Sequence, residues 1–139
     1  MLGPHVIQRG SNLTHERLRF DFSHGDRLAP AQLARIEALV DGWLARDLAV
    51  ERQVMSEAAA RALGAIGAFG EKYGEIVSVY AIVDRATGEV VSREFCGGPH
   101  VASTAELRGR RFQIVREQGL AAGVRRIKAV LAADACESR

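Results

Sequence analysis

The stretch IVSVYAIVDRATGEVVSREF at residues 76–95 predicts a β-hairpin. Residues 76–83 form an apolar run rich in β-branched side chains, which is typical of a buried strand. Residues 84–89, DRATGE, supply turn-forming side chains, and residues 90–95 return as the second strand. The hairpin leads directly into a glycine-rich bend, CGGPHV, at residues 96–101.

This bend places a thiol and an imidazole four positions apart, at Cys96 and His100. Thiolate and imidazole are ligands that zinc prefers, and Gly97 and Gly98 let the backbone fold so that both side chains can point at one ion. A stable zinc site uses three or four protein ligands, and this pair supplies two. The alternative interpretation is a buried free cysteine beside a loop histidine.

Further elements follow from local patterns on either side of the hairpin. Alternation predicts a half-buried strand within residues 13–22, and helical spacing predicts an amphipathic helix over 30–46 that begins at Pro30. The other expected elements are a strand at 49–55, a helix to residue 62 capped by Ser56, an irregular glycine-rich segment at 64–74, and strands at 111–115 and 123–130 separated by 117–119. The fold class is α+β, a mainly antiparallel sheet with two helices packed on it.

The composition is that of one globular domain. The chain has 139 residues, of which 47% are hydrophobic and 26% charged, and we expect a single domain over 1–132 followed by a polar tail at 133–139. No apolar run reaches the roughly 20 residues that span a bilayer, and residues 1–5 lack the features of a signal peptide. We therefore expect a cytoplasmic protein without membrane contact. Its two cysteines, Cys96 and Cys136, are expected to stay reduced, the latter as a surface thiol in the tail.

The net charge is only +2, but basic residues gather near the C-terminus. They are Arg108, Arg110, Arg111, Arg116, Arg125, Arg126 and Lys128. Such a local basic surface suits a phosphate backbone, and a solvated face is the alternative. Arg125 and Arg126 are adjacent on a predicted strand, so they should point to opposite faces, and at most one of them can meet a nucleic acid.

Five sequence blocks together resemble the editing domain of alanyl-tRNA synthetases and the freestanding aminoacyl-tRNA deacylases. The related domain of threonyl-tRNA synthetases is a more distant likeness. The blocks are QRGS at 8–11, LRFDFSH at 18–24, FGEKYG at 69–74, CGGPHV at 96–101 and AGVRRI at 122–127. They follow one another in the family's order over nearly the whole chain. At Pro99 the alanyl enzymes commonly carry threonine, so the Gly-Pro-His form looks more like the threonyl and freestanding members.

The resemblance implies a second-additional-domain fold and one zinc ion held by four side chains, an HxxxH pair and a CxxxH pair. Cys96 and His100 match the second pair, whereas none of His5, His15 and His24 has the spacing of the first. The first pair normally precedes the segment that residues 8–11 match, so half the metal site is expected to be missing. Zinc affinity, and catalysis by an isolated monomer, should then be low. A misassigned start site, a fragment or remnant, or completion by another subunit would each explain this.

The resemblance also implies the activity of a deacylase, an ester hydrolase that removes serine or glycine from mischarged alanine tRNA. Gln8 is expected to assist near the zinc, or to be a polar strand residue. Ser103 and Thr104 are expected to hydrogen-bond a phosphate or ribose hydroxyl at the tRNA acceptor end, or else to cap a turn. Arg125 and Arg126 are the candidate tRNA-binding cations, of which at most one is expected to face the tRNA. Asp21 and His24 could act as acid and base, although fixing the hairpin is the favoured interpretation.

A different class of function remains open. The chain could be a non-catalytic module that binds tRNA or a synthetase partner through its basic face, or that forms a homo-oligomer. GxGxxG and GxxxxGK[ST] motifs are missing from the sequence, and a synthetase core does not fit in 139 residues. ATP-dependent aminoacylation by this chain alone is therefore not expected.

Overall fold

The computed structural model of the chain describes residues 1–68 and 70–133. Its residues group into two compact units: unit 1 comprises Met1–Gly42 and Gly109–Arg139, and unit 2 comprises Trp43–Arg108. Both units are antiparallel sheets with a helix, so the predicted α+β class is confirmed. The prediction of one domain over 1–132 stays a prediction. Phe69 and the tail from residue 134 onward, with Cys136, lie outside the described residues.

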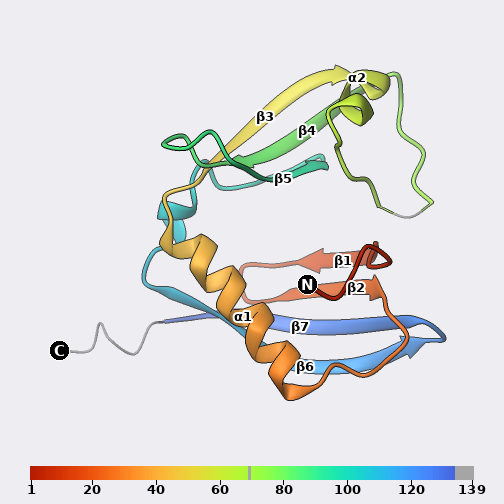
Figure 1. Ribbon diagram of the computed structural model, residues 1–139, viewed down its shortest axis with the longest axis vertical. Coiled ribbons are helices and arrows are strands. Elements are labelled where there is room, and N and C mark those ends of the chain that lie inside the picture. Colours follow the sequence, from red (N-terminus) through yellow and green to blue (C-terminus); the bar gives the residue numbers. More distant parts are fainter. Residues whose placement is uncertain (69, 134–139) are drawn as a thin grey trace. The chain divides into compact units, whose positions relative to one another are not determined.

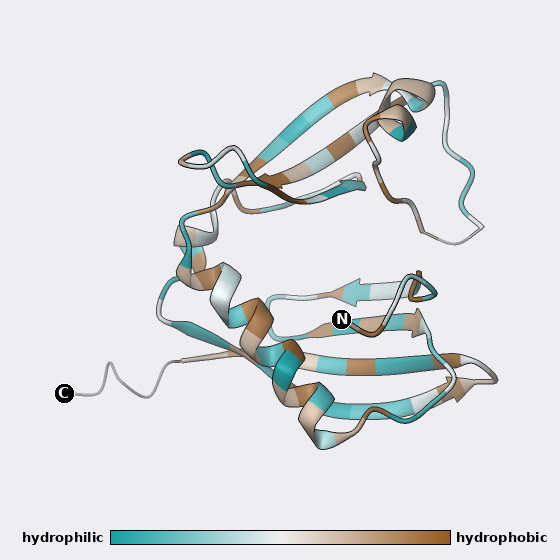
Figure 2. Ribbon diagram, in the orientation of Figure 1, coloured by the Kyte–Doolittle hydropathy of each residue, from teal (hydrophilic) through white to brown (hydrophobic). Residues whose placement is uncertain are grey.

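Unit 1 is a four-stranded sheet covered on one face by a helix (Figure 1). Its strands are β1 (Gln8–Leu13), β2 (Leu18–Ser23), β6 (Arg110–Ala121) and β7 (Val124–Ala133), in the order β1-β2-β7-β6. Helix α1 (Pro30–Ala45) matches the predicted helix to within one residue. Its Leu33 and Ile36 pack against a core of Phe22, Leu28 and Ile127. Polar and apolar residues alternate along β2 and β7 (Figure 2), because one face of each of these strands meets this core and the other does not.

Unit 2 is a three-stranded sheet, in the order β3-β4-β5. The strands are β3 (Ala49–Ser56), β4 (Ile76–Val83) and β5 (Val90–Phe95), so the predicted hairpin is confirmed. Helix α2 (Glu57–Ala62) begins where expected, with the Ser56 hydroxyl accepting the Ala59 N–H at 3.1 Å. Val79 and Ala60 are fully buried in the core of this unit.

The strand predicted within residues 13–22 is confirmed from Leu18 onward, as β2, but the part of the range before Leu18 is wrong. Leu13 ends β1, a turn follows, and the alternating residues belong to β2, which pairs antiparallel with β1. The Thr14 hydroxyl accepts the N–H groups of Glu16 and Arg17, which closes the turn between the two strands. The QRGS block carries little apolar alternation, so its strand is decided by pairing with β2 rather than by its own pattern.

The predicted break at residues 117–119 is also wrong, because β6 runs without interruption to Ala121. The pairing of β6 with β7 shifts register near Ile114 and near Gly119. At the position of the expected turn, β6 therefore has an irregularity in its pairing and does not end. Gly119 lies opposite Arg125, and a Cβ there would meet the guanidinium of Arg125 at 3.1 Å. This glycine therefore makes room for a side chain instead of ending a strand. The turn lies at Ala122 and Gly123, the latter with φ +69°.

None of the helices in the described residues is long and apolar enough to cross a membrane.

Candidate metal and substrate site

Cys96 and His100 converge in the bend that follows β5. Nε2 of His100 lies 3.1 Å from Sγ of Cys96, and the Gly98 N–H donates to the same sulfur at 3.4 Å. The Cys96 N–H donates to the carbonyl of Ser78 on β4, so the hairpin holds the start of the bend. Gly98 has φ +75°, a conformation that favours glycine, and it turns the chain back toward the sulfur. The expected convergence of thiol and imidazole is therefore present.

Tyr80 on β4 sets the position of the imidazole. Its ring centroid lies 4.3 Å from that of His100, with the planes tilted by 53°. A Cβ at Gly98 would lie 2.5 Å from the Tyr80 hydroxyl oxygen, so any side chain there would collide with the tyrosine. Sequence reasoning missed Tyr80, although the register of the hairpin could have found it. Tyr80 pairs with Glu94, two residues before Cys96, so the bend passes over it.

The pair fits a metal ion in part. In a tetrahedral zinc site the bond lengths to sulfur and nitrogen put these two ligand atoms about 3.5 Å apart. The 3.1 Å between Nε2 of His100 and Sγ of Cys96 is close to that spacing. However, the part of the chain that the structure describes contains no group of three or more His, Cys, Asp or Glu side chains that could hold a metal. Cys96 and His100 can therefore be two ligands of a site but not a complete site.

A pocket of about 320 Å³ lies beside the cysteine within unit 2. Among the residues that line it are Tyr73, Phe95 and Cys96, and the rings of Tyr73 and Phe95 stack with centroids 4.5 Å apart. The guanidinium of Arg61 lies 5.3 Å from the centre of the Phe95 ring. Residues 71–74 of the FGEKYG block line one side of this pocket, and the Tyr73 hydroxyl is held in place because it accepts the Ala68 N–H at 3.0 Å.

Ser103 and Thr104 have structural partners. The Ser103 hydroxyl caps the 3₁₀ helix Thr104–Leu107 in a capping box with Glu106, and it donates to Asp47 at 2.6 Å. Thr104 is buried, and its hydroxyl donates to the Arg46 carbonyl and accepts the Leu48 N–H. The geometry thus favours the capping interpretation for Ser103. Recognition of phosphate or ribose by either hydroxyl stays a prediction.

Arg125 and Arg126 point to opposite faces of β7, as predicted, and each is held by a carboxylate. Arg125 donates from Nε to Glu117 at 2.6 Å, on the face that carries the core. Arg126 donates from Nε and Nη2 to the two oxygens of Asp21, at 2.6 and 2.9 Å, on the other face. These hydrogen bonds lower the pKa of the buried Asp21, against the opposing effect of burial. Asp21 therefore ties β2 to β7, which is a structural role but a different one from the predicted fixing of a hairpin.

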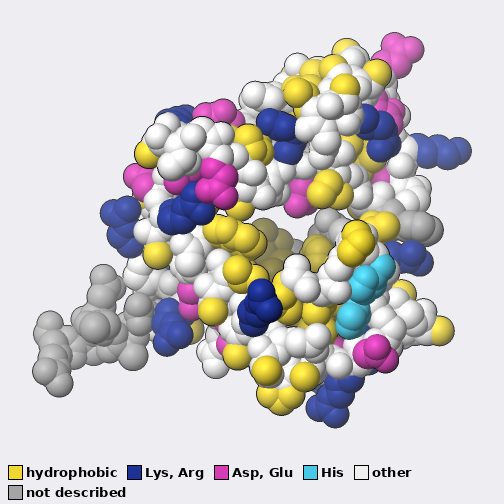
Figure 3. Space-filling model, in the orientation of Figure 1, with side chains coloured by type: hydrophobic (Ala, Val, Ile, Leu, Met, Phe, Trp, Pro, Cys, Tyr) yellow, Lys and Arg dark blue, Asp and Glu magenta, His cyan; other side chains and the backbone are white. Residues whose placement is uncertain are grey.

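Gln8 and the N-terminal histidines lie in unit 1. The Gln8 amide nitrogen donates to the Ser11 hydroxyl at 3.1 Å, and its catalytic role stays a prediction. Nε2 of His5 lies 2.8 Å from Nδ1 of His24, and the two rings stack with centroids 5.1 Å apart. Histidine side chains gather on the face shown in Figure 3. His24 thus holds the N-terminal segment against β2, a contact that the sequence spacing did not reveal.

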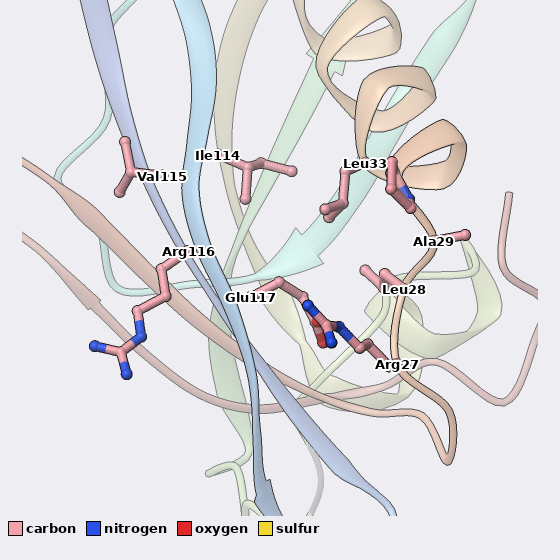
Figure 4. A pocket seen from close by; sticks show the side chains of 9 residues that line it. Arg27, Leu28, Ala29, Leu33, Ile114, Val115, Arg116 and Glu117 are labelled. Atoms are coloured by element: carbon pink, nitrogen blue, oxygen red, sulfur yellow. The ribbon is translucent and has the colours of Figure 1, made fainter.

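A second, larger pocket of about 510 Å³ lies between the start of α1 and β6 within unit 1. Its lining includes Arg27, Leu33 and Glu117, and Figure 4 shows their side chains on the same side of β6. None of the residues predicted for the site lines this pocket. This pocket belongs to unit 1, whereas Cys96 and His100 belong to unit 2.

The antiparallel α+β fold and the cysteine–histidine bend are those expected of a tRNA synthetase editing domain, and comparison with known proteins supports this resemblance. Residues 77–128, which include the bend, match the family described as "Threonyl and Alanyl tRNA synthetase second additional domain". The chain is 48% identical to the alanine–tRNA ligase of Treponema denticola over 94% of its length. It is 50% identical to that of Treponema pallidum over 94%, and 44% identical to that of Thermus thermophilus over 97%.

The resemblance drawn from the five blocks is therefore confirmed: the chain is similar to alanine–tRNA ligases over nearly all of its length, and its residues 77–128 match the second-additional-domain family. The chain spans only part of these relatives, 20% of the Treponema denticola protein and 15% of the Thermus thermophilus protein.

Proposed function

We propose that this chain is an aminoacyl-tRNA editing domain that hydrolyses the ester of mischarged alanine tRNA. The relatives it matches are named alanine–tRNA ligases, and the matched family is a domain of tRNA synthetases. The observation that carries the proposal is the 3.1 Å approach of the His100 imidazole to the Cys96 sulfur beside a pocket. Serine and glycine are the amino acids that we expect to be removed.

In this proposal Cys96 and His100 are two ligands of a zinc ion. The remaining ligands come from outside the described residues, either from a partner chain or from sequence joined to this one. When bound, zinc supplies Lewis-acid chemistry that favours attack of water on an ester. Tyr80 and Gly98 keep the two ligands in place. The Tyr80 ring packs on His100, and Gly98 leaves room for the Tyr80 hydroxyl beneath the bend.

The reaction is an ester hydrolysis. Water adds to the carbonyl carbon, the bond to the terminal ribose oxygen breaks, and that oxygen takes up a proton. The products are the free amino acid and the uncharged tRNA. Cys96, His100 and the pocket beside them belong to unit 2 and Gln8 belongs to unit 1, so assistance by Gln8 rests on the family resemblance.

The test measures serine release from seryl-tRNA specific for alanine, together with zinc per chain by elemental analysis. We expect zinc-dependent release, and loss of both release and zinc in Cys96→Ala and His100→Ala. Cys136→Ser is the matched control, because it removes the other thiol, and it should keep both. The hydrolase proposal fails if the zinc-supplied chain binds the tRNA but releases neither serine nor glycine. That result would instead support a non-catalytic tRNA-binding module.

A further inference from the structure

The strand register of unit 1 places three cationic residues in one row. Arg19 on β2 lies directly opposite Lys128 on β7, and Lys128 lies directly opposite Arg116 on β6. Residues directly opposite in antiparallel strands project from the same face of a sheet. The row therefore crosses three neighbouring strands, and we call these three residues the cation row.

The cation row lies on the face that α1 leaves open. Phe22, Ile127 and Ile114 point to the α1 side, where they pack with the helix. Residues of alternate parity point the other way. Figure 4 shows the Arg116 side chain on the side of β6 opposite to Ile114 and Leu33.

Asp21 is the only carboxylate at the described open-face positions of β2, β7 and β6. It is already occupied by two hydrogen bonds from Arg126. Arg19 reaches this carboxylate only at 3.7 Å. Within the described part of the chain, Arg116 and Lys128 form no ion pair. Other open-face positions hold Ser23, Arg111, Gln113, Gln118, Val124, Val130 and Ala132.

Three like charges placed opposite one another oppose folding. Neighbouring strands are about 4.8 Å apart, so the ends of the cation row are about 10 Å apart at the backbone. That is close to the Debye length of about 8 Å at physiological salt, so solvent ions screen the repulsion only in part. A ligand with several negative charges at similar spacing would relieve it, which favours a polyanion over a single small anion.

We propose that the cation row binds the phosphate backbone of tRNA. The inference rests on the proposed function for the choice of tRNA as the polyanion. Arginine and lysine contacts to phosphates position a nucleic acid without reading its sequence. The row therefore supplies affinity and orientation, and it leaves selection of the tRNA to other contacts.

The test compares two double variants of the full chain that lose the same charge. Arg116→Gln/Lys128→Gln removes two members of the cation row. Arg27→Gln/Arg35→Gln removes two exposed arginines from the loop before α1 and from α1 itself. The dissociation constant for an uncharged alanine tRNA transcript is measured at several salt concentrations. For the row variant we expect Kd to rise about tenfold and the slope of log K against log salt to become shallower by about two. The control variant should stay within about twofold of the parent.

Thermal unfolding separates lost binding from lost folding. Because the substitutions remove like-charge repulsion, the row variant should unfold at the same temperature as the parent or higher. Equal effects of the two double variants, or an unchanged salt slope, would overturn the inference, as would failure of the parent chain to bind the transcript.

The outcome for the cation row is distinguishable from that of the proposed function. A parent chain that binds tRNA through the row but hydrolyses no ester would refute the proposed function and leave the row intact. A row variant that deacylates seryl-tRNA with the parent's kcat/KM would refute the row and leave the editing proposal intact.

Discussion

Asp21 is a carboxylate that folding has removed from water, with only 4% of its surface exposed. Burial alone would favour its neutral form, but the two hydrogen bonds from Arg126 favour the ionised form and lower its pKa. Gly10 lies opposite Asp21 on β1, and a Cβ there would come within 3.2 Å of the carboxylate. Gly10 on β1 therefore leaves room for the Asp21 carboxylate, and Arg126 on β7 neutralises its charge.

Asp21→Asn should lower the free energy of unfolding by about 2 kcal/mol at neutral pH, because it breaks a buried hydrogen-bonded ion pair. Since the pKa of Asp21 is lower when folded, its contribution is present above the ordinary aspartate pKa of about 3.9 and is lost as pH falls through the folded value. Urea unfolding between pH 2 and pH 7 measures this dependence. Asp26→Asn, an exposed neighbour in the following loop, is the control. An Asp21→Asn curve parallel to that of the parent would contradict the assignment.

Helix α1 both covers the core of unit 1 and satisfies part of the sheet edge. Strand β6 is at the edge, so one row of its N–H groups has no partner strand. The Glu37 carboxylate accepts the Ile114 N–H at 2.6 Å, and the Asp41 carboxylate accepts the Phe112 N–H at 2.7 Å. The two acids are four residues apart on the helix, so they lie on the same side of it and match alternate residues of the strand.

Glu37→Ala/Asp41→Ala should destabilise the protein by about 3 kcal/mol, because two half-buried N–H groups lose charged acceptors. Amide hydrogen exchange should quicken at Phe112 and Ile114 before it does so elsewhere in β6. Glu37→Gln/Asp41→Asn keeps an acceptor oxygen at each position and should cost less. Unchanged exchange at these two amides would show that the carboxylates do not hold the edge.

Among the residues that the structure describes, each unit has its own buried core. Unit 1 is formed by both ends of the chain, and its β2 pairs with β7 across more than a hundred residues, as Phe20 with Ile127. Unit 2 is one continuous segment with its own buried cluster around Val79. Local contacts form at a smaller entropic cost than pairings between distant segments. Closing unit 1 therefore costs more chain entropy than closing unit 2.

Val79→Ala should leave a small cavity in unit 2 and destabilise it by about 2 kcal/mol. We expect amide exchange to quicken throughout residues 43–108 and to change less in β2 and β7, because regions with separate cores can open separately. Hydrogen exchange followed by mass spectrometry measures both regions at once. Equal loss of protection in both regions would favour the single cooperative domain that the composition predicts.

Local patterns in the sequence determined the elements whose formation depends on near neighbours. The hairpin of β4 and β5, helix α1 and the Ser56 cap follow from periodicity and turn chemistry, and the four-residue spacing of Cys96 and His100 brought their ligand atoms together. Tertiary structure alone decided the pairing of Asp21 with Arg126, the passage of β6 through Gly119 and the alignment of the cation row. Asp21 and Arg126 are about a hundred residues apart, and Gly119 is needed because the Arg125 side chain fills the space beside it. Periodicity within one segment carries no information on which distant segment it will pair with or on which side chain will fill a given space.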